Sequence, residues 1–228
     1  MSTNHTSATV SAIAARLGRL VIPDAEAEAR RQRAEKGERS SRSLELWARA
    51  DVPRRHADRA LHPCSTAPAT GWVQTRAQVL GMLGRGVTVC LTGTRGNGKT
   101  QIGVEAILAT TLKGNSALFR TAQRMFMEFK GTFDDGAKRT ELQVLENLRR
   151  PSLLVLDEIG QRTESEWENR TFFEVLNARY NDMSDTILTC NLTLQELRQN
   201  LGPSLVDRMK EGGGMVECNW PSFRASTP

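Results

Sequence analysis

The stretch Gly93-Thr94-Arg95-Gly96-Asn97-Gly98-Lys99-Thr100 decides the fold of this chain, because it fits the pattern G-x-x-x-x-G-K-[ST] at every fixed position. The glycines let backbone N–H groups curl around phosphate oxygens without clashes from Cβ atoms. The lysine of such a loop reaches the outer phosphates, and the hydroxyl after it can ligate Mg²⁺. The stretch therefore predicts a loop that binds the phosphates of a nucleotide.

The sequence on either side of this loop has the context that the loop needs. Val87–Leu91 predicts a short strand before it, and Lys99–Leu112 predicts a helix after it, with apolar residues on one face. The helix would direct the positive end of its dipole at the bound phosphates. We expect ATP to be held here by nine residues: Gly93, Thr94, Arg95, Gly96, Asn97, Gly98, Lys99, Thr100 and Gln101.

A second motif lies 58 residues after Lys99, where the apolar run Leu153–Leu156 is followed by Asp157 and Glu158. The carboxyl ends of strands in such sheets line the ligand crevice. Asp157 is expected to hold Mg²⁺ together with Thr100, and Glu158 is expected to orient and activate the attacking water. Taken alone, the pair could also be a helix N-cap. A water-activating Glu favours an ATPase over a small-molecule kinase.

Asn191 is the third candidate, because it closes a predicted strand over Thr186–Cys190. A side-chain amide at that place could hold the terminal phosphate or the attacking water. The alternative is a helix N-cap region, which Asn191 and Thr193 would serve equally well.

Strands and helices alternate from about residue 71 onward. Such alternation implies an α/β fold, with a parallel sheet covered by helices on both faces. The predicted strands are 87–91, 117–119, 152–156, 186–190 and 215–218, and the predicted helices are 99–112, 122–130, 138–148, 167–180 and 194–201.

Residues 1–70 have a different character and are expected to form a mostly helical, partner-binding arm or linker before an ATPase domain over 71–228. The arm carries 12 basic and 8 acidic residues, whereas the remainder carries 19 and 18. Ala25–Arg39 is charged and rich in alanine, which favours a solvated helix. Two short apolar patches, at residues 10–17 and 44–47, could dock a partner or pack back on the main domain.

Composition excludes other classes of protein. The longest uncharged apolar-rich run, Gly86–Thr94, is far shorter than the roughly 20 residues that a membrane-spanning helix needs. The four cysteines, at positions 64, 90, 190 and 218, are too scattered for a zinc site or a disulfide framework. With no apolar leader, these features lead us to expect a cytoplasmic protein that is not associated with a membrane.

These motifs resemble the AAA+ ATPases of the DnaC type, which load the replicative helicase in bacteria and phages. The resemblance covers roughly residues 86–224, and its more diagnostic parts are DEIGQRTESEWE (157–168) and NWPSFR (219–224). Transposition-helper ATPases of the IstB type are similar over the same core. The resemblance implies a P-loop NTPase (AAA+) core with a parallel five-stranded sheet and a minimal lid.

The resemblance also implies roles for single residues. Lys99 and Thr100 would be the Walker A residues, Asp157 and Glu158 the Walker B residues, and Asn191 the first sensor. Arg208 would be an arginine finger that reaches the ATP of a neighbouring subunit.

The implied partners are a DnaB-like hexameric replicative helicase, single-stranded DNA and further copies of the chain, which would associate through the ATP site. The implied function is ATP-dependent loading of the helicase in DNA replication. Two alternatives stay open: a transposition helper of the IstB type, and a nucleotide-gated adaptor with little turnover.

A surface for single-stranded DNA is proposed around the second predicted strand and the helix after it. Cations and aromatic rings together suit a single strand, through phosphate contacts and base stacking. The alternative is that Phe126 and Phe129 are core residues of an amphipathic helix. The candidate residues are Arg120, Arg124, Phe126, Phe129, Lys130, Lys138 and Arg139.

Overall fold

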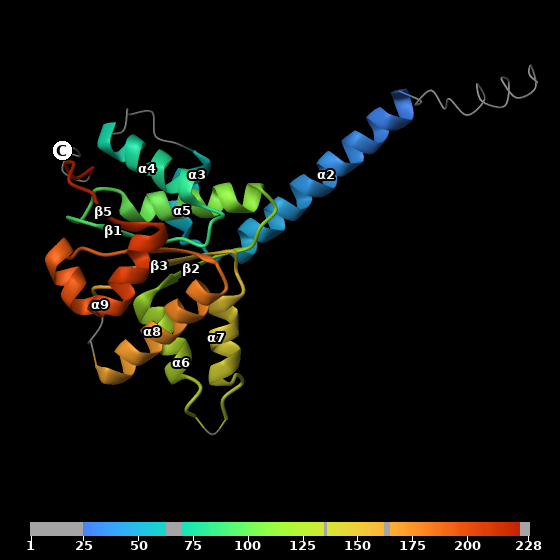
Figure 1. Ribbon diagram of the computed structural model, residues 1–228. Helices are drawn as coiled ribbons and strands as arrows, with labels where there is room; N and C mark the ends of the chain where they lie inside the picture. Colours follow the sequence, from blue (N-terminus) through green and yellow to red (C-terminus); the bar gives the residue numbers. More distant parts are fainter. Residues whose placement is uncertain (1–24, 63–69, 135, 162–164, 224–228) are drawn as a thin grey trace, which may run out of the picture. The chain divides into compact units, whose positions relative to one another are not determined.

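We describe a computed structural model of the chain, which covers residues 25–62, 70–134, 136–161 and 165–223 (Figure 1). The chain forms two compact units, Met1–Ser41 and Arg42–Pro228. Helix α2 (Ala25–Arg49) crosses the boundary between them. Its side chains from residue 33 to residue 42 are all exposed, as expected for a charged, alanine-rich segment. The apolar patch at residues 10–17 lies outside the described residues.

The second unit is built on one five-stranded sheet in which every neighbouring pair of strands is parallel. The strand order is β2-β3-β4-β1-β5, so β1 lies between β4 and β5. The strands are β1 (Thr88–Thr92), β2 (Ala117–Thr121), β3 (Leu153–Asp157), β4 (Asp185–Thr189) and β5 (Gly214–Glu217). The expected parallel α/β sheet is therefore confirmed.

Helices cover both faces of the sheet and give the unit two separate hydrophobic cores (Figure 1). Alternate residues of a strand point to opposite faces, so Leu153 and Val155 of β3 enter one core while Leu154 and Leu156 enter the other. The first core is covered by α3 (Arg54–Leu61), α4 (Thr70–Met82) and α5 (Lys99–Leu112). The second is covered by α6 (Ala122–Lys130), α7 (Glu141–Arg149), α8 (Glu166–Asn181) and α9 (Leu194–Gly212).

Two helices differ from their predicted bounds for identifiable reasons. Helix α7 begins at Glu141 rather than at residue 138, because Thr140 and Gln143 form a capping box that fixes its first turn. Helix α9 runs past residue 201 to Gly212. Gly202 interrupts it with non-helical φ and ψ angles and Pro203 follows, so a second helical piece carries Arg208.

The segment just before α3 packs against the sheet, which places the start of the compact unit at Arg42, upstream of the expected boundary at residue 70. Ala50 is fully buried, and its carbonyl oxygen accepts a hydrogen bond from the N–H of Phe119 at 2.8 Å. Trp47 packs on the same core, whereas Leu44 is 70% exposed. The apolar patch at residues 44–47 therefore contacts the sheet through Trp47.

Among the described helices, none is long and apolar enough to cross a membrane.

Candidate functional site

The phosphate-loop motif connects β1 to α5 at the carboxyl edge of the sheet. Its glycines are required by both conformation and space. Gly93 has a φ of 120°, and a Cβ there would lie 2.4 Å from the carbonyl oxygen of Cys218. Gly98 has a φ of 81°, and a Cβ there would lie 2.7 Å from Nε1 of Trp72. A side chain at either position would strain the backbone and displace a neighbour.

Hydrogen bonds tie the loop to the segment after β5 and to α4. They come from two indole N–H groups, one amide side chain and one backbone N–H. These bonds run from Trp220 Nε1 to Asn97 O (2.7 Å), from Asn97 Nδ2 to Cys218 O (2.5 Å), from Phe223 N to Gly96 O (3.0 Å) and from Trp72 Nε1 to Gly98 O (3.2 Å). The loop is thus held in shape from two sides.

Lys99, the first residue of α5, is only 6% exposed. Its ammonium group donates to three oxygens of its own loop: Gly93 O at 2.7 Å, Thr94 O at 2.7 Å and Asn97 Oδ1 at 3.0 Å. Burial lowers the pKa of Lys99, because desolvation disfavours its charged form. A cation held in this way among loop oxygens suits contact with phosphate.

Asp157 ends β3 and faces the hydroxyl groups of two threonines. Thr100 Oγ1 lies 3.0 Å from Oδ1 and 3.3 Å from Oδ2 of this carboxylate, and the Thr189 hydroxyl donates to Oδ1. Hydroxyl and carboxylate oxygens are the ligands that Mg²⁺ prefers, with water and phosphate completing its shell. The pair Thr100 and Asp157 therefore fits a magnesium ion bound next to the phosphate loop.

Thr189, at the end of β4, is a site residue that the motifs did not reveal. Its hydroxyl contacts Asp157 and also accepts a hydrogen bond from the N–H of Glu158 at 3.3 Å. Its side chain is buried, with 2% exposure. The signal in the sequence is weak: a hydroxyl at the end of a mostly apolar strand, next to the strand that carries the acids.

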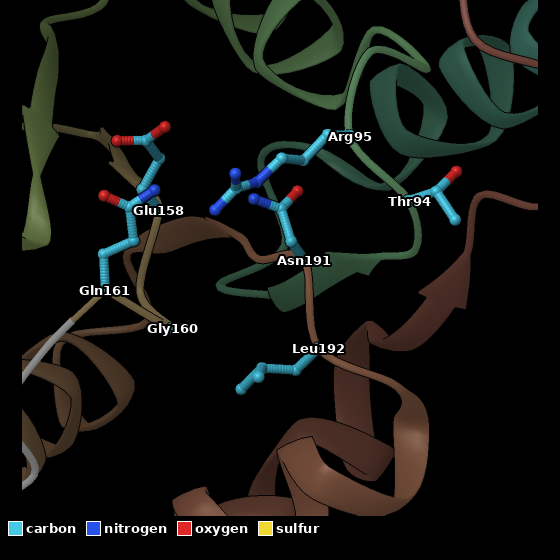
Figure 2. A pocket seen from close by; sticks show the side chains of 7 residues that line it. All are labelled: Thr94, Arg95, Glu158, Gly160, Gln161, Asn191 and Leu192. Carbon is cyan, nitrogen blue, oxygen red and sulfur yellow. The ribbon is translucent and has the colours of Figure 1, made fainter.

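A pocket of about 350 Å³ opens between the phosphate loop and the ends of β3 and β4 (Figure 2). Glu158 lines it from a left-handed backbone conformation, with a φ of 58°. Asn191 lines it from the end of β4, and Arg95 lines it from the loop. The full lining is Thr94, Arg95, Glu158, Gly160, Gln161, Asn191 and Leu192.

Arg208, the predicted arginine finger, lies on a different surface from this pocket. Its guanidinium donates to Asn177 Oδ1 on α8. It also lies over the rings of Phe173 and Tyr180, with Cζ 5.5 Å and 5.1 Å from their centroids. The structure therefore brings together the loop, Asp157, Glu158 and Asn191, and leaves Arg208 on α9 against α8.

The side chain of Gln101, a predicted nucleotide contact, is engaged by a helix outside the loop. Its Oε1 lies 3.2 Å from Nδ1 of His56 on α3, and its Nε2 donates to the carbonyl oxygen of the same residue at 3.3 Å. The side chain of Gln101 therefore links the phosphate-loop helix to α3.

The structure shows that several residues of the proposed DNA surface on β2 and α6 are buried or engaged with other residues of the chain. Phe126 and Phe129 are 3% and 2% exposed, so both belong to the core and neither can stack on a base. Arg120 and Arg124 form ion pairs with Asp51 and Glu128. Lys130 lies 5.5 Å from the centroid of the Trp167 ring. Lys138 and Arg139 remain as candidates in the turn before α7.

Taken together, the sheet order, the phosphate loop on β1 and the acidic end of β3 define a class of protein. This class is the P-loop ATPase of the AAA+ type. Residues 27–227 match the family described as "IstB-like ATP binding protein", and the chain belongs to that family.

Relatives of known name agree with this class. The chain is 31% identical to the replicative helicase loader DnaC of Escherichia coli (strain K12) over 134 residues, which are 58% of this chain and 54% of DnaC. The chain thus spans about half the length of the curated relatives it matches. This similarity identifies it as an ATPase of the DnaC type.

Solved structures show the same fold. The crystal structure of the DnaC helicase loader superposes with a TM-score of 0.61 and 21% identity, covering 72% of this chain and 99% of that one. The replication initiator DnaA bound to AMPPCP and single-stranded DNA superposes with a TM-score of 0.59 and 19% identity, covering 73% and 50%. The expected AAA+ core is thereby confirmed.

Proposed function

We propose that this chain is an ATP-dependent loader of a replicative DNA helicase, and that it hydrolyses ATP at contacts between its own copies. The observation that carries the proposal is the similarity to the loader DnaC, which is 31% identical to this chain over 134 residues. As a replication protein it would act in the cytoplasm.

In the proposed reaction the phosphate loop and Lys99 bind the phosphates of ATP. Thr100 and Asp157 would hold a magnesium ion, which offsets phosphate charge when bound. Glu158 orients a water molecule and accepts its proton as the water oxygen attacks the terminal phosphorus. The bond from that phosphorus to the bridging oxygen breaks, and ADP leaves with the electron pair. Asn191 holds the water or the terminal phosphate in line.

Arg208 is proposed to act on the ATP of a neighbouring copy. Two observations support this role. Its guanidinium is absent from the lining of its own pocket, and among the described residues it contacts Asn177, Phe173 and Tyr180 and forms no ion pair with a carboxylate. A cation supplied by a second copy would stabilise the charge that develops on the phosphoryl group. The full rate of hydrolysis would then depend on assembly.

The arm is proposed to bind the helicase, and the AAA+ unit to bind single-stranded DNA. The basic excess of residues 1–70 and the apolar patch at residues 10–17 support the first assignment. The structural likeness to DnaA, which was solved with single-stranded DNA, supports the second. Because residues 42–61 pack with the sheet, the arm that is free to grip a partner would end near Ser41.

The experiment that tests this proposal is co-purification of the full chain with a replicative helicase hexamer. The variant Ile13→Asp/Leu17→Asp is expected to abolish capture, because charge would disrupt an apolar contact. Leu112→Asp, on a side chain that is 58% exposed at the end of α5, makes the same chemical change elsewhere and is expected to leave capture intact. Equal capture by all three proteins would contradict the role of the arm.

A transposition helper is the second candidate, and the match to the IstB-like family over residues 27–227 favours it. The same capture assay decides between the two when a transposase is offered alongside the helicase. Capture of the transposase alone would assign the chain to transposition. A nucleotide-gated adaptor, the third candidate, would show hydrolysis that is equally slow in the wild type and in Glu158→Gln.

A further inference from the structure

Arg95 stands at the second variable position of the phosphate loop, and its side chain extends into the pocket that Glu158 and Asn191 line (Figure 2). Figure 2 shows its guanidinium directed across the pocket, toward the side on which Glu158 and Gln161 lie. Among the seven residues that line the pocket, it is the only cation. The loop motif itself requires no charge at this position.

The contacts of Arg95 differ from those of the other cation in the loop. Lys99 is buried and donates to three oxygens of its own loop. Arg95 is exposed, and within the described part of the chain its guanidinium forms no hydrogen bond or ion pair. The carboxylate of Glu158 and the amide of Asn191 are likewise without side-chain hydrogen bonds to described residues. The polar groups of this pocket are therefore available to a ligand.

The position of the pocket indicates which part of a nucleotide Arg95 would meet. The phosphates lie along the loop toward Lys99, and the water-activating acid belongs beyond the terminal phosphate. Arg95 shares the pocket with that acid, Glu158, so it lies where the terminal phosphoryl group and the attacking water meet. A guanidinium presents a planar fork of N–H donors that matches phosphate oxygens.

We propose that Arg95 is a catalytic residue that contacts the terminal phosphate of ATP within its own subunit. This role rests on the site proposed above. As the phosphoryl group transfers, negative charge develops on the leaving oxygen and is spread over the three equatorial oxygens, and a cation placed beside them lowers the barrier. Arg95 gives each subunit a charge in cis, and Arg208 of a neighbour would add a second charge on assembly. The chain thereby hydrolyses ATP slowly as a single copy.

The test measures ATP hydrolysis by the full chain over a wide dilution series in Mg²⁺, for the wild type, Arg95→Ala, Arg95→Lys and Glu158→Gln. Arg95→Ala is expected to lower kcat about 10- to 100-fold, the size of one lost hydrogen bond to a charged group. The loss is expected at every protein concentration, with little change in KM. Arg95→Lys is expected to restore only part of the rate, because lysine lacks the fork.

Arg85→Ala is the matched control. Arg85 is exposed, forms no hydrogen bond or ion pair with described residues, and precedes β1 at the end of the strand opposite the loop. This variant makes the same charge change and is expected to keep the wild-type rate. A second readout is binding of ADP with fluoroaluminate, which mimics the transferring phosphoryl group. Arg95→Ala is expected to weaken that binding and to leave binding of ADP alone unchanged.

The outcomes separate this role from the site on which it rests. A lower rate in Glu158→Gln with an unchanged rate in Arg95→Ala overturns only the role of Arg95. A rise in KM at constant kcat overturns it as well, because Arg95 would then bind the ground state. A loss confined to concentrated protein would mean that Arg95 acts on a neighbour, which contradicts action in cis. An unchanged rate in Glu158→Gln overturns both the site and this inference.

Discussion

Substitution of Thr189 tests how Asp157 and Glu158, at the end of β3, are held in place. Its buried hydroxyl donates to Asp157 and accepts from the backbone N–H of Glu158, whose φ of 58° is a strained conformation for a residue with a side chain. Thr189→Val keeps the shape of the side chain and removes both hydrogen bonds. Thr189→Ser keeps the hydroxyl and removes only a methyl group, which makes it the matched control.

The magnitude follows from the contacts. A hydrogen bond to a charged group contributes about 1.5–3 kcal/mol, and a bond between neutral groups contributes about 1 kcal/mol. Thr189→Val is therefore expected to lower the free energy of unfolding by about 2.5–4 kcal/mol. In a chain of this size that corresponds to a fall in Tm of roughly 5–16 °C.

The effect on catalysis separates positioning from stability. Because Asp157 and Glu158 would lose their shared support, kcat is expected to fall about 10-fold, or ~1.4 kcal/mol, at temperatures where the protein is fully folded. The Mg²⁺ concentration that gives half-maximal activity is expected to rise. Calorimetry and a steady-state ATPase assay with Mg²⁺ titration measure these quantities. A Thr189→Val protein with wild-type kcat and Mg²⁺ response would refute the reasoning, whatever its Tm.

Three further substitutions have expected outcomes that the contacts define. Gly98→Ala places a side chain at a φ of 81° and 2.7 Å from Trp72 Nε1. The backbone strain costs about 1–3 kcal/mol, so both nucleotide affinity and Tm should fall. Nucleotide titration and calorimetry measure the two effects. Trp220→Phe keeps an aromatic ring, though a smaller one, and removes the donor to Asn97 O. About 1 kcal/mol of stabilisation of the loop should be lost, so nucleotide titration should show weaker binding. Unchanged affinity would mean that the loop keeps its shape without this bond. Arg179→Met removes a fully buried guanidinium that donates to five oxygens. Burial lowers the pKa of Arg179 to about 10. Unfolding in urea should show that the free energy of unfolding falls by about 3–5 kcal/mol in this variant. Arg179→Lys cannot reach all five acceptors and should recover only part of that loss.

The sheet and the phosphate site were predictable because local pattern determines them. A run of apolar residues such as 153–156 can be satisfied only by burial on both faces, and a glycine-rich turn between strand and helix has few other uses. Asn191 followed from its place after a strand, since parallel strands end at one edge. These positions depend on neighbours within a few residues along the chain.

The parts that escaped prediction depend on contacts that are distant in sequence. Trp220 and Asn97 are 123 residues apart, and Thr189 and Asp157 are 32 apart; no local pattern records either pair. The packing of residues 42–61 against the sheet was not predicted, because a segment with so many charged residues is expected to be exposed to solvent. For Phe126 and Phe129 the local pattern supported two interpretations. Helical periodicity indicated core positions, which the structure confirms, whereas the nearby cations suggested a DNA surface.

We propose that the ATP site is completed by a second copy of the chain, and mixing two impaired variants tests this most directly. Glu158→Gln keeps Arg208 but lacks the acid, and Arg208→Ala keeps the acid but lacks the finger. In a mixed assembly some ATP sites would have both groups: Glu158 from an Arg208→Ala copy and Arg208 from a neighbouring Glu158→Gln copy. We expect the mixture to hydrolyse ATP faster than either variant alone at the same total concentration. A rate equal to the average of the two would contradict it.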